Sequence, residues 1–219
     1  MSVVRSEFGP TLPELLGPRV RALPLAGRLG LALAAAATLA LVAWLVLVKP
    51  EQGLDTVVVR GPVTFNLVYA SDALHRTPPR AGELLRLRTR SGPPSSMTVR
   101  SQRLAPYRGD VTAALTLFSV GLIERLRREY HGFVYRSDGR VNINGQPGYQ
   151  VVFQAPIGGH TTYGKRILLV SATDPAPRVA ADITLLARRS SAVPKADAVG
   201  ANGVLKAPLR TLTFGTSQP

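Results

Sequence analysis

The residues that could do chemistry in this chain are scattered, and they match no known catalytic or metal-binding pattern. The three histidines, His75, His131 and His160, lie far apart in the sequence, whereas a zinc site needs about three or four converging ligands. No G-x-S-x-G, H-E-x-x-H or Walker A motif occurs. Asp138 and Asp174 do not stand out as a carboxylate pair among the scattered acidic residues. We therefore expect no catalytic residue, no cofactor and no metal ion.

Positive charge is the second chemical feature, and arginine carries most of it. The chain has 27 Lys plus Arg against 13 Asp plus Glu, for a net charge of +14. This composition is typical of a GC-rich genome, and it would also attract a polyanion such as lipid head groups or acidic wall polymers. Nucleic acid is not an expected partner, because no zinc-finger spacing, zipper heptad or aromatic RNA-binding strand occurs. If the charge is functional, the candidate contacts are the arginines of two strands and one helix end: Arg86, Arg88, Arg100, Arg103, Arg125, Arg127 and Arg128.

An apolar run near the N-terminus predicts that a transmembrane helix attaches the chain to a membrane. Residues 29–48 carry no charge, and a helix of about 20 residues spans roughly 30 Å, the thickness of the hydrocarbon core of a bilayer. The length of the run and the bulky residues at its end favour an uncleaved anchor over a cleaved signal peptide. Positive residues are slightly more frequent just before the run than just after it, which favours a cytoplasmic N-terminus.

These features divide the chain into four parts. We expect a cytoplasmic leader at 1–28, a transmembrane helix at 29–48, a linker at 49–55 and an extracytoplasmic α+β domain at 56–215. The predicted location is the cell membrane, which the chain would cross once.

Alternating apolar and polar residues predict the first strands of the domain. Residues 57–59 and 65–69 flank a Gly-Pro turn and indicate a hairpin. Two further strands are expected at 84–89 and 97–104, with arginines on the polar face. Residues 71–82 are polar and contain two adjacent prolines, so we expect a loop there.

Residues 110–130 predict one long amphipathic helix. Asp110 follows a glycine and is a typical N-cap. Ser119 is expected off the apolar stripe, and Glu124 is expected to pair with Arg128 one turn later. The stripe follows the helical spacing of three and four: Val111, Leu115, Phe118, Leu122 and Leu126.

Four further strands follow, and short turns join the later ones into an antiparallel meander. Glycine-containing turns are expected at 137–139, 144–148 and 157–160. A weak helix of small residues is expected at 190–203, and 205–214 should return to the core. The four strands are predicted at 133–136, 148–155, 163–173 and 178–187.

This order of elements resembles the Mog1/PsbP-like α/β/α sandwich family, including the LpqN-like exported proteins of actinobacteria. The resemblance rests on TFNLVY at 64–69, the helix at 110–130 and INGQPGYQVVFQ at 143–154, which a long strand ending near Ala172 follows. It covers about residues 54–215. LpqN-like members often carry a lipid on a cysteine, and this chain has no cysteine, so the transmembrane helix would replace that anchor. The resemblance implies an antiparallel-sheet sandwich with a binding or assembly role at a membrane, and it transfers no functional residue.

Together these observations predict a membrane-anchored, non-catalytic extracytoplasmic domain. It would contact a partner protein or an anionic lipid or glycan of the cell envelope, through loops held by a rigid sheet. Two alternatives stay open. A carrier of a small hydrophobic ligand would need a pocket between the sheet and the helix, and an envelope hydrolase would need a histidine near a carboxylate in a cleft.

Overall fold

The computed structural model describes residues 53–216 and, before them, residues 24, 26, 30, 33, 34 and 36–39. Within these residues, no helix is both long enough and apolar enough to cross a membrane. The predicted leader at 1–28, the transmembrane helix at 29–48 and the start of the linker at 49–55 lie largely outside the described residues and stay predictions.

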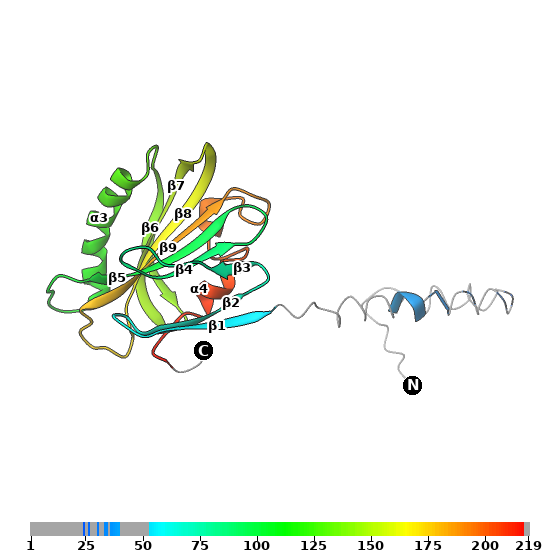
Figure 1. Cartoon of the computed structure of the whole chain (residues 1–219), viewed down its shortest axis with the longest axis horizontal. Coiled ribbons are helices and arrows are strands. Elements are labelled where there is room, and N and C mark those ends of the chain that lie inside the picture. Colours follow the sequence, from blue (N-terminus) through cyan, green and yellow to red (C-terminus); the bar gives the residue numbers. More distant parts are fainter. Residues whose placement is uncertain are drawn as a thin grey trace, which may run out of the picture. The chain divides into compact units, whose positions relative to one another are not determined.

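A seven-stranded antiparallel sheet forms the centre of the domain (Figure 1). Its last four strands in the chain form the predicted meander, and the last of them then pairs with a strand from the first half of the domain. In spatial order the strands are β3 (Leu74–Arg76), β4 (Glu83–Thr89), β5 (Ser95–Arg103), β9 (Val179–Arg188), β8 (His160–Leu169), β7 (Gln146–Ile157) and β6 (Val134–Ile143).

One face of this sheet packs against a second, smaller sheet. The predicted hairpin is confirmed: β1 (Leu54–Val59) pairs with β2 (Phe65–Ala70), and β10 (Thr213–Phe214) joins the other side of β2. The short helix α4 (Lys206–Arg210) lies against β2. The larger of two apolar clusters fills the space between the two sheets, and Phe65, Leu67, Leu85, Met97, Ile183 and Leu212 are among its fully buried members.

The opposite face packs against α3 (Val111–Glu129), as Figure 1 shows. The backbone N–H of Thr112 donates to the Asp110 carboxylate, so the predicted N-cap is confirmed. Leu115, Leu122 and Leu126 are fully buried against strands β7 and β8. Ser119 is buried as well, contrary to the prediction, because its hydroxyl is satisfied within the helix by donating to the Thr116 carbonyl oxygen at 2.7 Å.

The predicted antiparallel α+β fold is confirmed, with a difference in the layer opposite α3. That layer is a three-stranded sheet with the five-residue α4, and no long helix lies there among the described residues. The weak helix predicted at 190–203 is wrong, since only the short 3₁₀ helix Ala196–Ala198 forms in it. The glycines at 200 and 203 adopt positive φ angles of 74° and 68°, which end helical geometry.

Two predicted irregular segments are strands. Residues 74–76, predicted as part of a loop, form the edge strand β3 beside β4. Residues 137–139, predicted as a turn, lie inside β6, where Asp138 is opposite Val151 and a register shift follows Tyr135. The Asp138 carboxylate accepts the Tyr149 hydroxyl at 2.7 Å, so a side chain of the neighbouring strand satisfies a residue that favours turns when isolated.

Candidate functional site

Helix α3 leaves part of its own side of the large sheet uncovered. It packs over β7 and β6, whereas most side chains of β4 and β5 that share this side, and those of Thr184 and Leu186 on β9, are half-buried or exposed. Directly opposed residues of antiparallel strands share a face, and Arg88 is opposite Ser96, which is opposite Leu186. We call this surface the open face and define it by Arg86, Arg88, Ser96, Thr98, Arg100, Thr184 and Leu186.

A buried carboxylate neutralises two arginines of the open face. Glu83 has a fully buried side chain and accepts two hydrogen bonds from the guanidinium of Arg86, one of them at 2.7 Å from Nε. Arg100 donates to the same carboxylate at 3.2 Å. The hydrogen bonds from Arg86 are the largest cause that lowers the pKa of Glu83, to about 2. Arg86 and Arg100 are therefore held in an ionic cluster and are not both available to a ligand.

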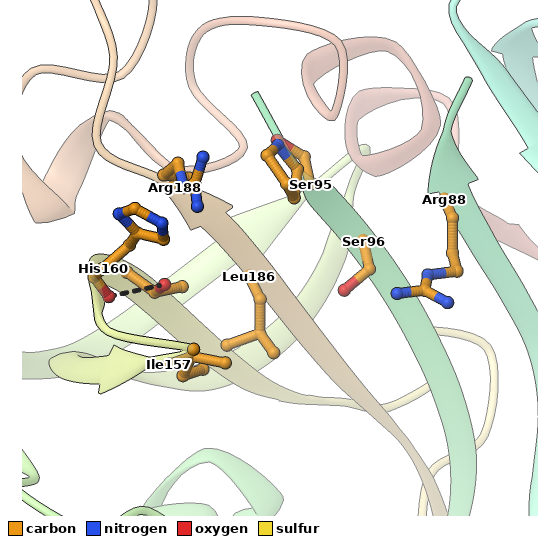
Figure 2. Close-up of a pocket in the computed structure, with 10 residues that line it drawn as sticks. Arg88, Ser95, Ser96, Ile157, His160, Leu186 and Arg188 are labelled. Carbon is orange, nitrogen blue, oxygen red and sulfur yellow. Dashed lines mark hydrogen bonds between the residues drawn. The ribbon is translucent and has the colours of Figure 1, made fainter. Parts of the chain in front are cut away.

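A pocket of about 310 Å³ lies at the end of the open face. Its basic side chains are Arg88 from β4, His160 from the start of β8 and Arg188 from the end of β9. Figure 2 shows the Arg88 guanidinium directed toward Ser96, with Arg188 and His160 on the other side of Leu186. The pocket is lined by Arg88, Pro94, Ser95, Ser96, Ile157, Gly158, His160, Thr162, Leu186 and Arg188.

The pocket is positively charged and contains no acidic lining residue. Neither Arg88 nor Arg188 takes part in any of the ion pairs found in the part of the chain that the structure describes. A guanidinium stays protonated in proteins and offers five N–H donors in a planar fork. Pro94, Ile157 and Leu186 add apolar surface. The pocket can therefore hold an anionic group next to a short apolar segment.

A tight glycine turn and the alternation of side chains along β9 place the residues of this pocket. The Gly158-Gly159 pair has φ angles of 58° and 77°, the left-handed geometry of a two-residue hairpin, and it brings His160 directly opposite Ile157. Alternation along β9 then puts Leu186 and Arg188 on one face. The predicted turn at 157–160 is therefore confirmed, and it forms one wall of the pocket.

His75 extends the open face beyond Arg88. It lies on β3 directly opposite Arg88, and its Nδ1 atom is buried without a hydrogen-bond partner in the described part of the chain. A buried polar atom without a partner costs free energy, and this nitrogen has no accessible surface on the open face.

The seven arginines predicted as contacts do not form one site. Arg88 lies in the pocket, and Arg86 and Arg100 are paired with Glu83. Arg103 and Arg125 line a separate depression of about 250 Å³ between the end of β5 and α3.

The remaining two predicted arginines lie on the last turn of α3. Arg127 forms an exposed ion pair with Glu124 at 2.7 Å, so the predicted pairing of Glu124 with Arg128 is not the observed one. Arg128 is exposed.

Arg188 and His160 are the pocket residues that the sequence reasoning did not select. Arg188 stands just beyond the predicted strand at 178–187, and His160 was placed in a turn without a role. Extending the period-two pattern of Thr184 and Leu186 by one step would have put Arg188 on the same face.

The arrangement provides groups that can bind an anion, and His160 has no hydrogen-bonded catalytic partner in the part of the chain that the structure describes. No carboxylate hydrogen-bonds the His160 ring, and neither Ser95 nor Ser96 hydrogen-bonds it, among the interactions of the described residues. No group of three or more His, Asp or Glu side chains within the same residues could hold a metal ion. The chemistry assembled in the pocket is that of anion recognition.

Comparison with known proteins identifies similar structures at low sequence identity. No protein-family model matches the chain, and no curated protein sequence matches it. LpqN of Mycobacterium tuberculosis, described as involved in cell envelope biogenesis, is 13% identical over 76% of this chain and 94% of its own, with a TM-score of 0.49. PsbP of the cyanobacterium Synechocystis is 8% identical over 66% of this chain and 84% of its own, with a TM-score of 0.39.

A third similar structure is a protein of unknown function from Pseudomonas aeruginosa, described as a putative regulator. It is 10% identical over 64% of this chain and 72% of its own, with a TM-score of 0.32. At these identities and TM-scores the likenesses do not extend to function. The family predicted from the sequence was the Mog1/PsbP-like family with its LpqN-like members, and an LpqN and a PsbP are both among the solved structures to which this chain is similar.

Proposed function

We propose that this chain is a non-catalytic, membrane-anchored domain of the cell envelope that binds an anionic amphiphile in the pocket of Arg88, His160 and Arg188. The observation that carries this proposal is that one pocket, which no acidic residue lines, contains two arginines that form no ion pair among the described residues. Attachment through residues 29–48, with the domain outside the cytoplasm, is the part of the proposal that rests on sequence alone.

The lining suggests the class of ligand. A phosphate or carboxylate group can accept bidentate hydrogen bonds from guanidinium groups, and the hydroxyls of Ser95 and Ser96 add short-range donors. The apolar side chains of Ile157 and Leu186 would cover the first carbon atoms attached to that group. A phosphate ester with a short alkyl chain fits this description better than a bare inorganic anion, which would leave the apolar surface unused.

Calorimetric titration of the full chain in a neutral detergent with hexyl phosphate tests the proposal. The double variant R88Q/R188Q should lose at least tenfold in affinity, because charge-assisted hydrogen bonds are about twice as strong as neutral ones. The matched control is R125Q/R128Q, which removes the same charge from α3 and should bind as the native chain does. Equal losses in both variants would show that only net charge matters and would overturn the pocket assignment.

An uncharged ligand and the salt dependence of binding distinguish the contribution of the basic side chains from that of the apolar lining. Hexanol, which lacks the phosphate, should bind at least tenfold more weakly than hexyl phosphate. Affinity for hexyl phosphate should fall with ionic strength, because exposed charges are screened over roughly 8–10 Å near physiological salt. Equal binding of hexanol would instead favour the alternative function of a hydrophobic-ligand carrier.

A further inference from the structure

One buried charge in this domain has no ion-pair partner. Among the described residues, four charged side chains are buried: Glu83, Lys165, Arg166 and Asp182. Glu83 is paired with two arginines, and Arg166 is paired with Asp182 at 2.6 Å. Lys165 takes part in none of the ion pairs found among the described residues. An unpaired charge in the interior costs free energy. The groups around Lys165 should therefore explain why a lysine is buried there.

The ammonium group of Lys165 uses only part of its hydrogen-bonding capacity. Nζ donates to the main-chain oxygen of Asp197 at 3.3 Å, and an ammonium has three donors. Burial is the main influence on the group and lowers the pKa of Lys165, while the charge of Asp197 acts in the opposite direction. The side chain is therefore held in the interior with donors left over.

Lys165 lines a pocket of about 390 Å³ on the face of the large sheet opposite the open face. Its neighbour Arg166 points to the α3 side, where it reaches Glu129, and alternation places Lys165 on the other side. The pocket lies between strands β6, β7 and β8 and the segment that ends in α4. Its volume is within the range of about 300–1,000 Å³ that is typical of small-molecule sites.

Three residues with amide side chains line the same pocket, and Gln150, opposite Ile167 of β8, is the one nearest to Lys165 along the sheet. Asn142, Asn144 and Gln150 line the pocket together with Lys165 and Arg210, and no acidic residue lines it. No side-chain hydrogen bond of these three amides occurs in the described part of the chain. Each amide can both donate and accept a hydrogen bond, which matches hydroxyl groups, whereas the Lys165 ammonium matches an anionic group. Ile143, Ile167 and Leu209 provide the apolar part of the lining.

We propose that this second pocket binds a small hydroxylated carboxylate, of the sugar-acid class, whose carboxylate contacts Lys165 and whose hydroxyls contact Gln150. The site is separate from the pocket of Arg88 and Arg188, since the two lie on opposite faces of the same sheet. The ligand adds a negative charge beside a buried ammonium that forms no ion pair among the described residues.

Titration of the full chain with galacturonate tests this inference, and modified ligands provide controls that need no mutation. Galacturonate should bind, whereas its methyl ester and galactose, which lack the charge, should bind at least tenfold more weakly. Equal binding of the ester, or no binding of galacturonate up to 10 mM, roughly the weakest affinity worth assigning to a site, would overturn the proposal.

Variants and chemical labelling locate the binding. K165M should lose at least tenfold in affinity for galacturonate. K206M, which replaces an exposed lysine on α4, and R88Q/R188Q should bind galacturonate as the native chain does. Reductive methylation followed by mass spectrometry is well suited to this chain, because it has only four lysines, Lys49, Lys165, Lys195 and Lys206. Galacturonate should slow the labelling of Lys165 alone. Unchanged affinity in a folded K165M would refute the assignment.

Discussion

Replacing Glu83 with glutamine should destabilise the domain by about 2 kcal/mol at pH 7. Its hydrogen bonds with Arg86 lower the pKa of the Glu83 carboxyl from 4.5 to about 2, a difference that corresponds to about 3 kcal/mol of stabilisation. The Glu83 side chain is fully buried, but that of Arg100 is 45% exposed. Solvent therefore screens part of this ionic cluster, and we reduce the expected cost accordingly.

The pH dependence identifies the cause of this loss. Because the folded-state pKa of Glu83 is lowered, its stabilisation is fully present above pH 4.5 and is lost as the pH falls toward 2. Urea unfolding of the native chain and of E83Q should therefore differ by about 2 kcal/mol at pH 7 and by less than half of that at pH 3. Comparing the two proteins at each pH removes the contribution of the other carboxylates.

An exposed ion pair on α3 provides the matched control. Glu124 and Arg127 are 56% and 60% exposed, so E124Q should cost less than about 0.5 kcal/mol at either pH. A loss in E83Q that is equal at pH 7 and pH 3 would refute the electrostatic reasoning and assign the effect to packing. A loss no larger than that of E124Q would show that burial does not strengthen the Glu83 cluster.

Three further changes should lower the stability measured by urea unfolding. D182N leaves the buried Arg166 guanidinium without its main carboxylate and should cost roughly 3 kcal/mol; a cost below about 1 kcal/mol would contradict this. G164A places a Cβ atom into the ring of Phe153 and should cost about 1–3 kcal/mol, with no loss expected if the ring can move aside. L122A empties a fully buried site under α3 and should cost about 2–5 kcal/mol, whereas the exposed V120A should change little.

Local sequence patterns were sufficient to predict an element when the residues that define it lie next to one another in the chain. The α3 helix was predictable because the apolar stripe and the Asp110 cap both lie within it. The hairpin turn at Asn144-Gly145 was predictable because both residues tolerate the positive φ angles of 49° and 79° that the turn requires.

Sequence patterns missed or shortened the strands that depend on pairing with another part of the chain. Strand β3 has only three residues, and its hydrogen-bonding partner β4 stabilises it. The middle of β6 contains Asp138 and Gly139, which favour turns, but both residues pair with β7. Sheet registers connect residues far apart in the sequence, and no local pattern reports such pairing.

Three properties can be read from the amino-acid sequence alone: the amount of positive charge, the alternation that puts arginines on one face of β4, and the absence of any catalytic motif. Which of these charges are free depends on how the strands pack against one another. Arg86 lies beside the buried Glu83, while Arg88, two residues later, is between His75 and Ser96 of neighbouring strands. Likewise, only packing against the segment around Asp197 shows that Lys165 is buried without an ion pair. The physical reason is that charge neutralisation depends on distances of a few ångströms, and strand pairing sets those distances.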